Sequence, residues 1–526
     1  MATEFITTFG AAVTVPAALL TYFWPNRAIG SDYRPDIPHP PEFPLVGSLP
    51  DLIAMQGCIH DFISAAHQIL GQTWYFFLFF LATLSPLLIV LHSWLVRRSF
   101  TALLFPRQIM TIDARNVEHV LKNKFENYSK GDDFHTKMFD MFGDGIFNAN
   151  GEKWRYQRKT ASHIFNVKNF RDWFTGVFLD EAKIAFKILD ERAANLEEID
   201  LNNLFYRYTL ESFLKIGFGT AIDAMDMSKD VQFAKSFDFV QSEIGIRQVQ
   251  PLWRITETFS SLFFPSRRLK KHVKVVDEFA HKIIQERRNN PDTTKQDLLS
   301  RFIFNTKNEN GEPLSDKELR DIVLNFIIAG RDTTAGTLAW TFYCLMNHPE
   351  VEAKVYEEVC SQIGDRDELE PQETYEVVKR LTYTTAVWNE VLRLFPSVPL
   401  NQKMAMSDDF LPDGTFVKKG DHVVWSSYSM GRNEAIWGPD AREFKPERWL
   451  KENERKPSAF EWPAFNAGPR TCLGQMLATI EGVLVIALLV KRYRFRLVPD
   501  QTIMYAMSLT LPMKEGMKVI VEKRKP

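Results

Sequence analysis

The feature that most constrains the fold is a cysteine in a glycine-rich loop directly before a long apolar helix. Cys472 lies in the loop 465–474, and the apolar pattern predicts a helix from 475 to about 489. Free backbone N–H groups and the positive end of the helix dipole favour a thiolate at such a position. A lone cysteine is more often a small buried hydrophobic residue, but the flanking glycines and Arg470 favour a functional thiolate.

Composition and charge exclude several classes of protein. The chain has 526 residues, 45% apolar and 25% charged, and Lys+Arg 64 against Asp+Glu 66 gives a formal net charge of -2. These globular proportions exclude a mostly disordered, collagen-like or coiled-coil chain. The interleaved charges lack the basic stripe that nucleic-acid binding requires. Four cysteines are too few and too scattered for a disulfide scaffold or a CxxC zinc site, so we expect a reducing, cytosol-facing compartment.

An uncharged apolar run begins almost at the N-terminus. Residues 5–26 can span a bilayer core of about 30 Å as a helix. Aromatic residues at the end of the run, followed by Arg27 and Arg34, match an interfacial belt with a positive cytoplasmic flank. We therefore expect a signal anchor over 1–27 and a proline-rich, semi-rigid hinge over 28–48. A buried or interfacial helix is the alternative, whereas the run lacks the features of a cleaved signal peptide.

Most of the remaining chain has helical periodicity. From about 116 to 346, apolar residues recur at helical spacing between charged faces. The best-defined helix begins at Ser315, which forms a Ser-x-x-Glu capping box with Glu318, and ends before the proline that follows His348. The strand-like stretches are short: 109–113, 415–417, 422–425 and 494–498.

A polar segment, Ala-Gly-Arg-Asp-Thr-Thr at 329–334, lies in the middle of this long helix. Its glycine, aspartate and threonines are weak helix formers and cost stability there. One interpretation is a tolerated polar face. The other is a local opening of the helix that turns a threonine hydroxyl toward a ligand.

The loop 465–474 has the pattern Phe-x-x-Gly-x-Arg-x-Cys-x-Gly and resembles the haem-binding loop of the cytochrome P-450 superfamily at every fixed position. The resemblance extends from about Pro35 to the C-terminus. It implies a mainly α fold with small peripheral β-sheets, in a single large catalytic domain, 49–526, that follows the anchor and hinge. Other motifs occur in that family's order and spacing: Trp-x-x-x-Arg at 154–158, the oxygen-activation motif at 329–334, Glu-x-x-Arg at 390–393 and Pro-Glu-Arg-Trp at 446–449.

The resemblance also implies residue roles. Cys472 is expected to be the axial ligand of a haem b iron, and Asp332 and Thr333 to serve oxygen activation and proton delivery. Lys403 stands where the family commonly has an arginine, so it supplies a point charge rather than a fork. The residues expected to hold the haem are Trp154, Arg158, Arg470, Lys403 and Gly474, and those expected to form a buried structural network are Glu390, Arg393 and Arg448.

The substrate class follows from a narrower resemblance. Segments 143–148, 151–154 and 157–162 are similar to the long-chain ω-hydroxylases of plants, fungi and related eukaryotes. This implies insertion of one oxygen atom of O2 into a terminal C–H bond of a fatty acid or alkane. An apolar pocket alone would accept many lipophiles, so sterols, terpenoids and xenobiotics stay open. The expected pocket residues are Phe134, Phe147, Phe326, Ala329, Val398 and Leu511; Ala329 replaces the glutamate that animal ω-hydroxylases often esterify to haem, so no covalent link is expected.

The sequence contains no recognisable flavin or nicotinamide domain. We therefore expect electrons from NADPH through a separate membrane-bound reductase, with cytochrome b5 left open as a further partner. Lys153, Arg155 and Lys159 are the expected docking cations, and a solvated helix face is the alternative. The expected location is the endoplasmic reticulum membrane, with the catalytic domain facing the cytosol.

Two other classes of protein are alternatives to the monooxygenase. One is a haem-thiolate isomerase, dehydratase or sensor, and the other is a non-enzymatic membrane protein built around two transmembrane helices. The presence of both Asp332 and Thr333 favours the monooxygenase.

A second apolar run, 75–98, is surplus to the family pattern, in which the first helix passes straight into the first strand. As a membrane segment it would separate that strand from its helix. We interpret it as a retained intron or a gene-model artefact, and a real second membrane contact is the alternative.

Overall fold

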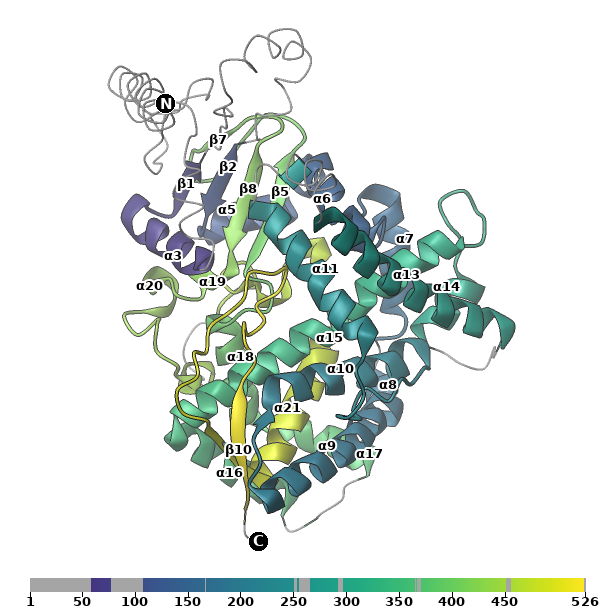
Figure 1. Ribbon diagram of the computed structural model, residues 1–526. Coiled ribbons are helices and arrows are strands. Elements are labelled where there is room, and N and C mark those ends of the chain that lie inside the picture. Colours follow the sequence, from purple (N-terminus) through teal and green to yellow (C-terminus); the bar gives the residue numbers. More distant parts are fainter. Residues whose placement is uncertain are drawn as a thin grey trace, which may run out of the picture. The chain divides into compact units, whose positions relative to one another are not determined.

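The computed structural model describes residues 58–76, 107–165, 167–249, 253–254, 265–291, 297–364, 366, 370–450 and 456–524. These residues form a mainly helical structure with small sheets (Figure 1). They belong to two compact units, one within Met1–Gly131 and Leu400–Asn433, the other within Asp132–Pro399 and Glu434–Pro526. Each unit has a sheet of its own.

The first unit is built on a five-stranded sheet with the order β1-β2-β8-β5-β3. β8 pairs in parallel with β2 and antiparallel with β5, and all five of its residues are buried. A strand covered on both faces needs no alternation of polar residues, which explains the continuous apolar run Val423–Trp425. The elements of this unit are α3 (Ile59–Leu70), β1 (Thr73–Phe76), β2 (Gln108–Thr111), α5 (Ala114–Glu118), η2 (His119–Asn123), η3 (Phe125–Asn127), β3 (Tyr128–Ser129), β5 (Leu400–Ala405), β6 (Asp409–Phe410), β7 (Phe416–Val417), β8 (His422–Ser426) and α19 (Ser427–Met430).

The second unit is mainly helical and also contains a three-stranded sheet with the order β4-β10-β9. Its elements before residue 316 are α6 (Asp132–Phe142), α7 (Gly151–Ser162), α8 (Val167–Asn169), η4 (Phe170–Phe174), α9 (Thr175–Asn195), β4 (Ile199–Asp200), α10 (Leu201–Phe218), α11 (Gln232–Val249), α13 (Pro265–Asn289) and α14 (Leu298–Asn305). The later ones are α15 (Asp316–Asn347), α16 (Pro349–Ile363), α17 (Pro371–Arg380), α18 (Thr382–Leu394), α20 (Glu434–Trp437), η5 (Pro446–Trp449), η6 (Pro463–Phe465), η7 (Gly468–Arg470), α21 (Gln475–Arg492), β9 (Tyr493–Leu497) and β10 (Lys518–Lys523).

Helix α15 is the central element of the second unit and contacts α10, α18 and α21 (Figure 1). The predicted capping box begins it: the Glu318 N–H donates to the Ser315 hydroxyl at 3.3 Å, and the Ser315 N–H donates to the Glu318 carboxylate at 2.9 Å. Gly330 allows α10 to approach, because a Cβ there would lie 1.9 Å from the Phe213 ring. The helix is continuous through 329–334, so the structure shows no local opening there.

Local sequence signals predicted several elements correctly. The four strand-like stretches are confirmed by β2, β7, β8 and β9, and the apolar helix after Cys472 is α21. Strands β5 and β10 were not expected. β5 is polar at Asn401, Gln402 and Lys403, so its sequence lacks the apolar signal of a buried strand.

The anchor 1–27, the hinge 28–48 and residues 77–98 of the insertion lie outside the described residues. Tyr75 and Phe76 end β1, which pairs antiparallel with β2. Within the described part of the chain, no helix combines the length and apolar character needed to cross a membrane. The domain boundaries stay predictions.

Candidate active site

The cysteine loop turns tightly before α21. The Cys472 N–H donates to the Phe465 carbonyl at 2.8 Å, and the Thr471 hydroxyl donates to the Gly468 carbonyl at 2.7 Å. Gly468 has a φ of 61°, a left-handed conformation that glycine adopts without strain. Gly474 is the N-cap residue of α21, and a Cβ there would lie 3.8 Å from the Cys472 sulfur. The loop therefore holds the sulfur at the start of the helix.

The protonation of Cys472 differs from the sequence-based expectation. A backbone hydrogen bond from Gly474 and the charge of Arg158 both lower the pKa of the thiol, but burial outweighs them and raises it. The residue is nevertheless exposed. A sulfur that is surrounded by protein but not covered can be reached by a ligand. Because a coordinating metal deprotonates a thiol outright, the thiolate follows from metal binding rather than from the helix dipole.

Two guanidinium groups and a tryptophan lie close to this loop. Arg158 donates to the Thr471 carbonyl at 2.7 Å, and Arg470 donates to the Ala149 carbonyl at 2.9 Å. The guanidinium carbons lie 5.8 Å (Arg158) and 4.2 Å (Arg470) from the buried Trp154 ring. Burial first, and then the like charge of Arg158, lowers the pKa of Arg470 to about 10.

These two cations have no carboxylate partner in the part of the chain that the structure describes. Their side-chain hydrogen bonds go to neutral carbonyl and amide oxygen atoms, and Nε of Arg470 is buried without a hydrogen-bond partner among the described residues. Two partly desolvated like charges beside a thiol fit a ligand with two anionic groups and a thiol-binding metal.

Lys403, expected at the same ligand, lies in β5 of the first unit and is buried, with its Nζ 5.7 Å from the Phe125 ring centroid. Its role stays a prediction. A buried cation suits a ligand with anionic groups. Within the first unit, an aromatic ring lies near the ammonium group.

The polar segment of α15 contains a buried acid. Asp332 Oδ1 accepts from Gln241 Nε2 at 3.0 Å and from Arg331 Nη1 at 3.2 Å, and Arg331 also pairs with the half-exposed Asp238 of α11. Burial raises the pKa of Asp332 to about 7. Its second oxygen, Oδ2, is buried with no hydrogen-bond partner among the described residues. Gln241 and Asp238 were not identified from the sequence, because α11 lies some ninety positions earlier in the chain and carries no motif.

Thr333 bonds to its own helix. Its hydroxyl donates to the Ala329 carbonyl at 2.8 Å, and its carbonyl accepts from Ser397 at 3.0 Å. The structure therefore matches the polar-face alternative and not the helix opening. With its proton engaged, Oγ1 keeps lone pairs that can accept a hydrogen bond.

The expected structural network surrounds one buried carboxylate. Glu390 accepts from Arg393 at 2.8 and 2.7 Å and from Arg448 at 2.9 Å. The indole of Trp449 donates at 2.9 Å and the N–H of Lys445 at 2.8 Å. The side chains of Glu390 and Arg393 are both 0% exposed. This network joins α18 to the segment around η5, which precedes the cysteine loop.

Several expected pocket residues are connected around α15. Ser397, next to Val398, bonds to the Thr333 carbonyl, and its own carbonyl accepts from the Leu511 N–H at 3.1 Å. Phe326 and Leu511 are buried, whereas Ala329 and Val398 are partly exposed. Phe134, in α6, is also partly exposed, and α6 contacts α15. Phe147 is 39% exposed and contacts the Phe142 ring.

The expected docking cations differ in their partners. Lys153 lies 3.8 Å from Asp144 and 3.9 Å from Glu309, and Arg155 pairs with Glu152. Lys159 is exposed at the end of α7. All three occupy the helix that also carries Trp154 and Arg158.

Fold and site together define a mainly helical enzyme with a ligand-accessible cysteine beside two guanidinium groups. The chain matches the cytochrome P450 family model over residues 99–518. It is 38% identical over 482 residues to cytochrome P450 704B1 of Arabidopsis thaliana, which covers 82% of this chain and 91% of that protein. It is 36% identical to cytochrome P450 86B1 of the same plant, over 91% of this chain and 85% of that protein. It is 33% identical to cytochrome P450 monooxygenase cyp1 of Mycosarcoma maydis, over 95% of this chain and 77% of that protein. The chain belongs to the cytochrome P450 family and is a monooxygenase.

Membership of the family implies haem, O2, an electron donor and a small-molecule substrate. The residues fit haem: Cys472 offers a reachable sulfur, and Arg158 and Arg470 offer two cations for its two propionates. When bound, haem activates O2 for insertion into a C–H bond, with the thiolate as electron-donating ligand.

Replacing Glu390 with glutamine tests the buried network. The change keeps the shape but removes the buried carboxylate charge that Arg393 and Arg448 share, and Arg448 keeps only its longer contact with Asp440 at 3.4 Å, so we expect a loss of about 3–5 kcal/mol in unfolding free energy. Glu447→Gln is the matched control, because Glu447 pairs with Lys354 at a partly exposed position and should lose about 0–1 kcal/mol. Urea denaturation of both variants measures the difference, and equal midpoint shifts would contradict the assignment.

Asp332→Asn tests the raised pKa. The ordinary pKa of an aspartate is 3.8, and that of folded Asp332 is about 7. At a pH between these two values, folded Asp332 keeps a proton that the unfolded chain releases. Its contribution to stability is therefore present at low pH and is lost as pH rises through this window, by a few kcal/mol in total. The stability of the wild type relative to Asp332→Asn should fall from pH 4 to pH 7 and then level off. Denaturation at matched haem content measures it, and a difference that does not vary with pH would show that Asp332 is ionised throughout.

Proposed function

We propose that this monooxygenase hydroxylates the terminal carbon of long-chain fatty acids or alkanes. The observation that carries the proposal is the segment 143–148, which is similar to long-chain ω-hydroxylases and is bonded to α15 close to the expected pocket. The Phe147 N–H donates to Asn325 Oδ1 at 3.0 Å, one turn of helix before Ala329. Phe326 adjoins Asn325 in the sequence and is buried.

In this proposal the chain delivers protons through Asp332. Its carboxyl has a pKa of about 7 and so holds or releases a proton near neutral pH. Asp238 is half exposed and pairs with Arg331, which also contacts Asp332, so the arginine connects the buried acid to solvent. Thr333 follows Asp332 directly and offers Oγ1 as an acceptor to a ligand in the pocket.

The electrons come from NADPH through a separate reductase that docks on the cationic face of α7. Arg155 and Lys159 are exposed there, on the helix that carries Arg158. The proposed location is the endoplasmic reticulum membrane, with 1–27 as the anchor. Cytochrome b5 is a candidate second donor.

The substrate proposal is tested with the full-length chain and a reductase in membranes. We expect NADPH-dependent hydroxylation at the terminal carbon across a panel of C12–C18 fatty acids and alkanes, identified by mass spectrometry. Product from a sterol, terpenoid or xenobiotic panel, with none from the acyl panel, would overturn the substrate class but not the monooxygenase.

Thr333→Ala tests the role of the hydroxyl. We expect the yield of product per NADPH oxidised to fall several-fold while NADPH oxidation continues, because proton delivery becomes disordered. Thr341→Ala is the matched control, since Thr341 makes the same bond to the carbonyl four residues earlier, at 2.7 Å, two turns further along the helix. Full coupling in Thr333→Ala would remove Thr333 from the mechanism.

A further inference from the structure

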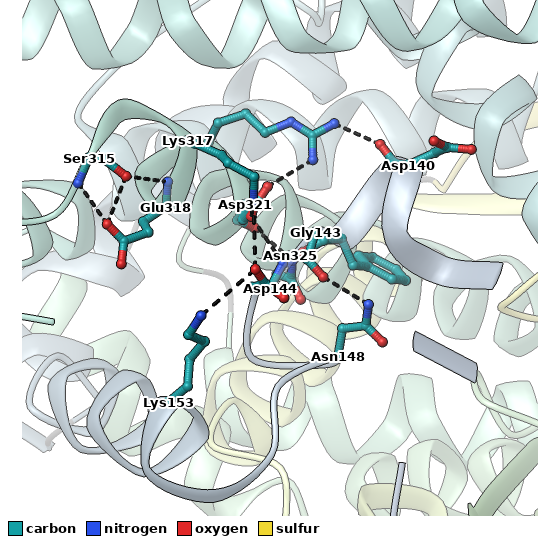
Figure 2. Close-up of polar contacts among 12 residues, drawn as sticks. Asp140, Gly143, Asp144, Asn148, Lys153, Ser315, Lys317, Glu318, Asp321 and Asn325 are labelled. Atoms are coloured by element: carbon teal, nitrogen blue, oxygen red, sulfur yellow. Dashed lines mark hydrogen bonds and ion pairs between the residues drawn. The ribbon is translucent and has the colours of Figure 1, made fainter. Parts of the chain in front are cut away.

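The loop between α6 and α7 is attached to α15 by two side chains one turn apart (Figure 2). Asp321 Oδ2 accepts from the Asp144 N–H at 3.0 Å, and Asn325 Oδ1 accepts from the Phe147 N–H at 3.0 Å. Asn325 Nδ2 also donates to the Phe142 carbonyl at 2.9 Å. The two side chains therefore bind the backbone of residues 142–147 and not their side chains.

Both side chains are buried, and their polar groups are engaged in hydrogen bonds and ion pairs. Asn325 is 0% exposed, and its amide uses Oδ1 once and Nδ2 twice, the second donation reaching the Asp321 carbonyl at 2.7 Å. Asp321 is 2% exposed, and Arg320 and Lys317 balance its charge at 3.0 Å each. Buried polar groups of this kind cost about 1–3 kcal/mol when a partner is removed, so the loop is held firmly.

The approach is so close that it requires glycine at two positions. A Cβ on Gly143 would lie 2.1 Å from the carboxylate carbon of Asp321, and Gly143 also has a φ of 47°. A Cβ on Gly145 would lie 2.1 Å from Asn325 Nδ2. The two glycines of the segment are thus explained by the two α15 side chains.

The same loop holds Arg470 through its carbonyl groups. Arg470 donates to the Ile146 carbonyl at 3.3 Å and to the Ala149 carbonyl at 2.9 Å. Asn148 braces the loop internally by donating to the Gly143 carbonyl at 2.8 Å (Figure 2). N–H groups of the loop thus face α15, while two of its carbonyls hold a guanidinium that lies two residues before Cys472.

We propose that Asp321 and Asn325 are positioning residues for haem binding, which act by fixing the loop 143–149 so that its carbonyls orient Arg470 toward a haem propionate. The proposal rests on the family's haem and does not depend on the substrate. Arg470 needs these acceptors because it is desolvated and lies near the like charge of Arg158. A loop free to move would let the guanidinium turn away.

Asn325→Leu in the full-length, haem-loaded chain is the principal test. Leucine has the same number of heavy side-chain atoms, branched at Cγ as in asparagine, and removes all three hydrogen bonds. We expect haem transfer to apomyoglobin to become about 10-fold faster, the size of effect typical of groups that orient a metal site from outside its ligands. Ser315→Ala is the matched control, because it weakens the same helix at its cap without touching the loop, and its haem transfer rate should stay within twofold of the wild type.

A double-mutant cycle with Arg470→Lys separates positioning from general destabilisation. If Asn325 acts through Arg470, Asn325→Leu should add little to the transfer rate of Arg470→Lys. Equal effects in both backgrounds, or a rate for Asn325→Leu equal to that of Ser315→Ala, would overturn the proposal. If Asn325→Leu does not accumulate, Gly145→Ala displaces the loop from Asn325 and must accelerate transfer to a similar extent.

Discussion

A long buried helix that carries polar side chains must provide each of them with a partner, and the second unit is arranged around this requirement. Along α15, Asp321 and Asn325 bind the loop before α7, Asp332 binds Gln241, and Thr333 binds its own carbonyl ladder. An unpartnered group at the buried positions Asp321, Asn325 or Asp332 would cost about 1–3 kcal/mol. One oxygen, Oδ2 of Asp332, is left without a partner among the described residues. Burial raises the pKa of Asp332, and the unpartnered Oδ2 is an atom that can hold the proton in the proposed function.

The cysteine illustrates how two local effects compete. A helix start and free N–H groups stabilise a thiolate, but burial destabilises it more, so the thiol of the chain itself has a raised pKa. Metal binding and deprotonation are therefore coupled. Arg158 favours both the deprotonation of Cys472 and the binding of haem. Its charge lowers the pKa of Cys472, and its guanidinium group suits a propionate. The residues around the sulfur thus suit a ligand that brings both a thiol-binding metal and anionic groups, as haem does.

The sequence alone predicts those helices and strands whose formation depends on residues adjacent in the chain. The capping box at Ser315, the apolar helix after Cys472 and the buried strand β8 follow from residues adjacent in the chain. The contacts of Asp332 with Gln241 and of Asn325 with Phe147 join distant segments, and no local pattern encodes them. A faint signal existed, since Asp321, Asn325, Ala329 and Thr333 recur every four residues on one face of the helix. The helix opening was wrong because tertiary packing outweighs the weak helix propensity of 329–334.

The segment 143–148 supports both the proposed substrate and the proposed positioning of Arg470. The contacts of its residues determine how strongly its similarity to ω-hydroxylases bears on the substrate. Gly143 and Gly145 are explained by the approach of Asp321 and Asn325, and Asn148 by its bond to the Gly143 carbonyl. None of these three residues needs to touch a substrate. Phe147 differs, because its backbone is fixed by Asn325 while its side chain is 39% exposed. Similarity over this segment therefore speaks first for a shared way of attaching the loop to α15, and only through Phe147 for a shared acyl substrate. Substituting Phe147 should then alter the product profile more than haem retention, whereas substituting Asn325 should do the reverse.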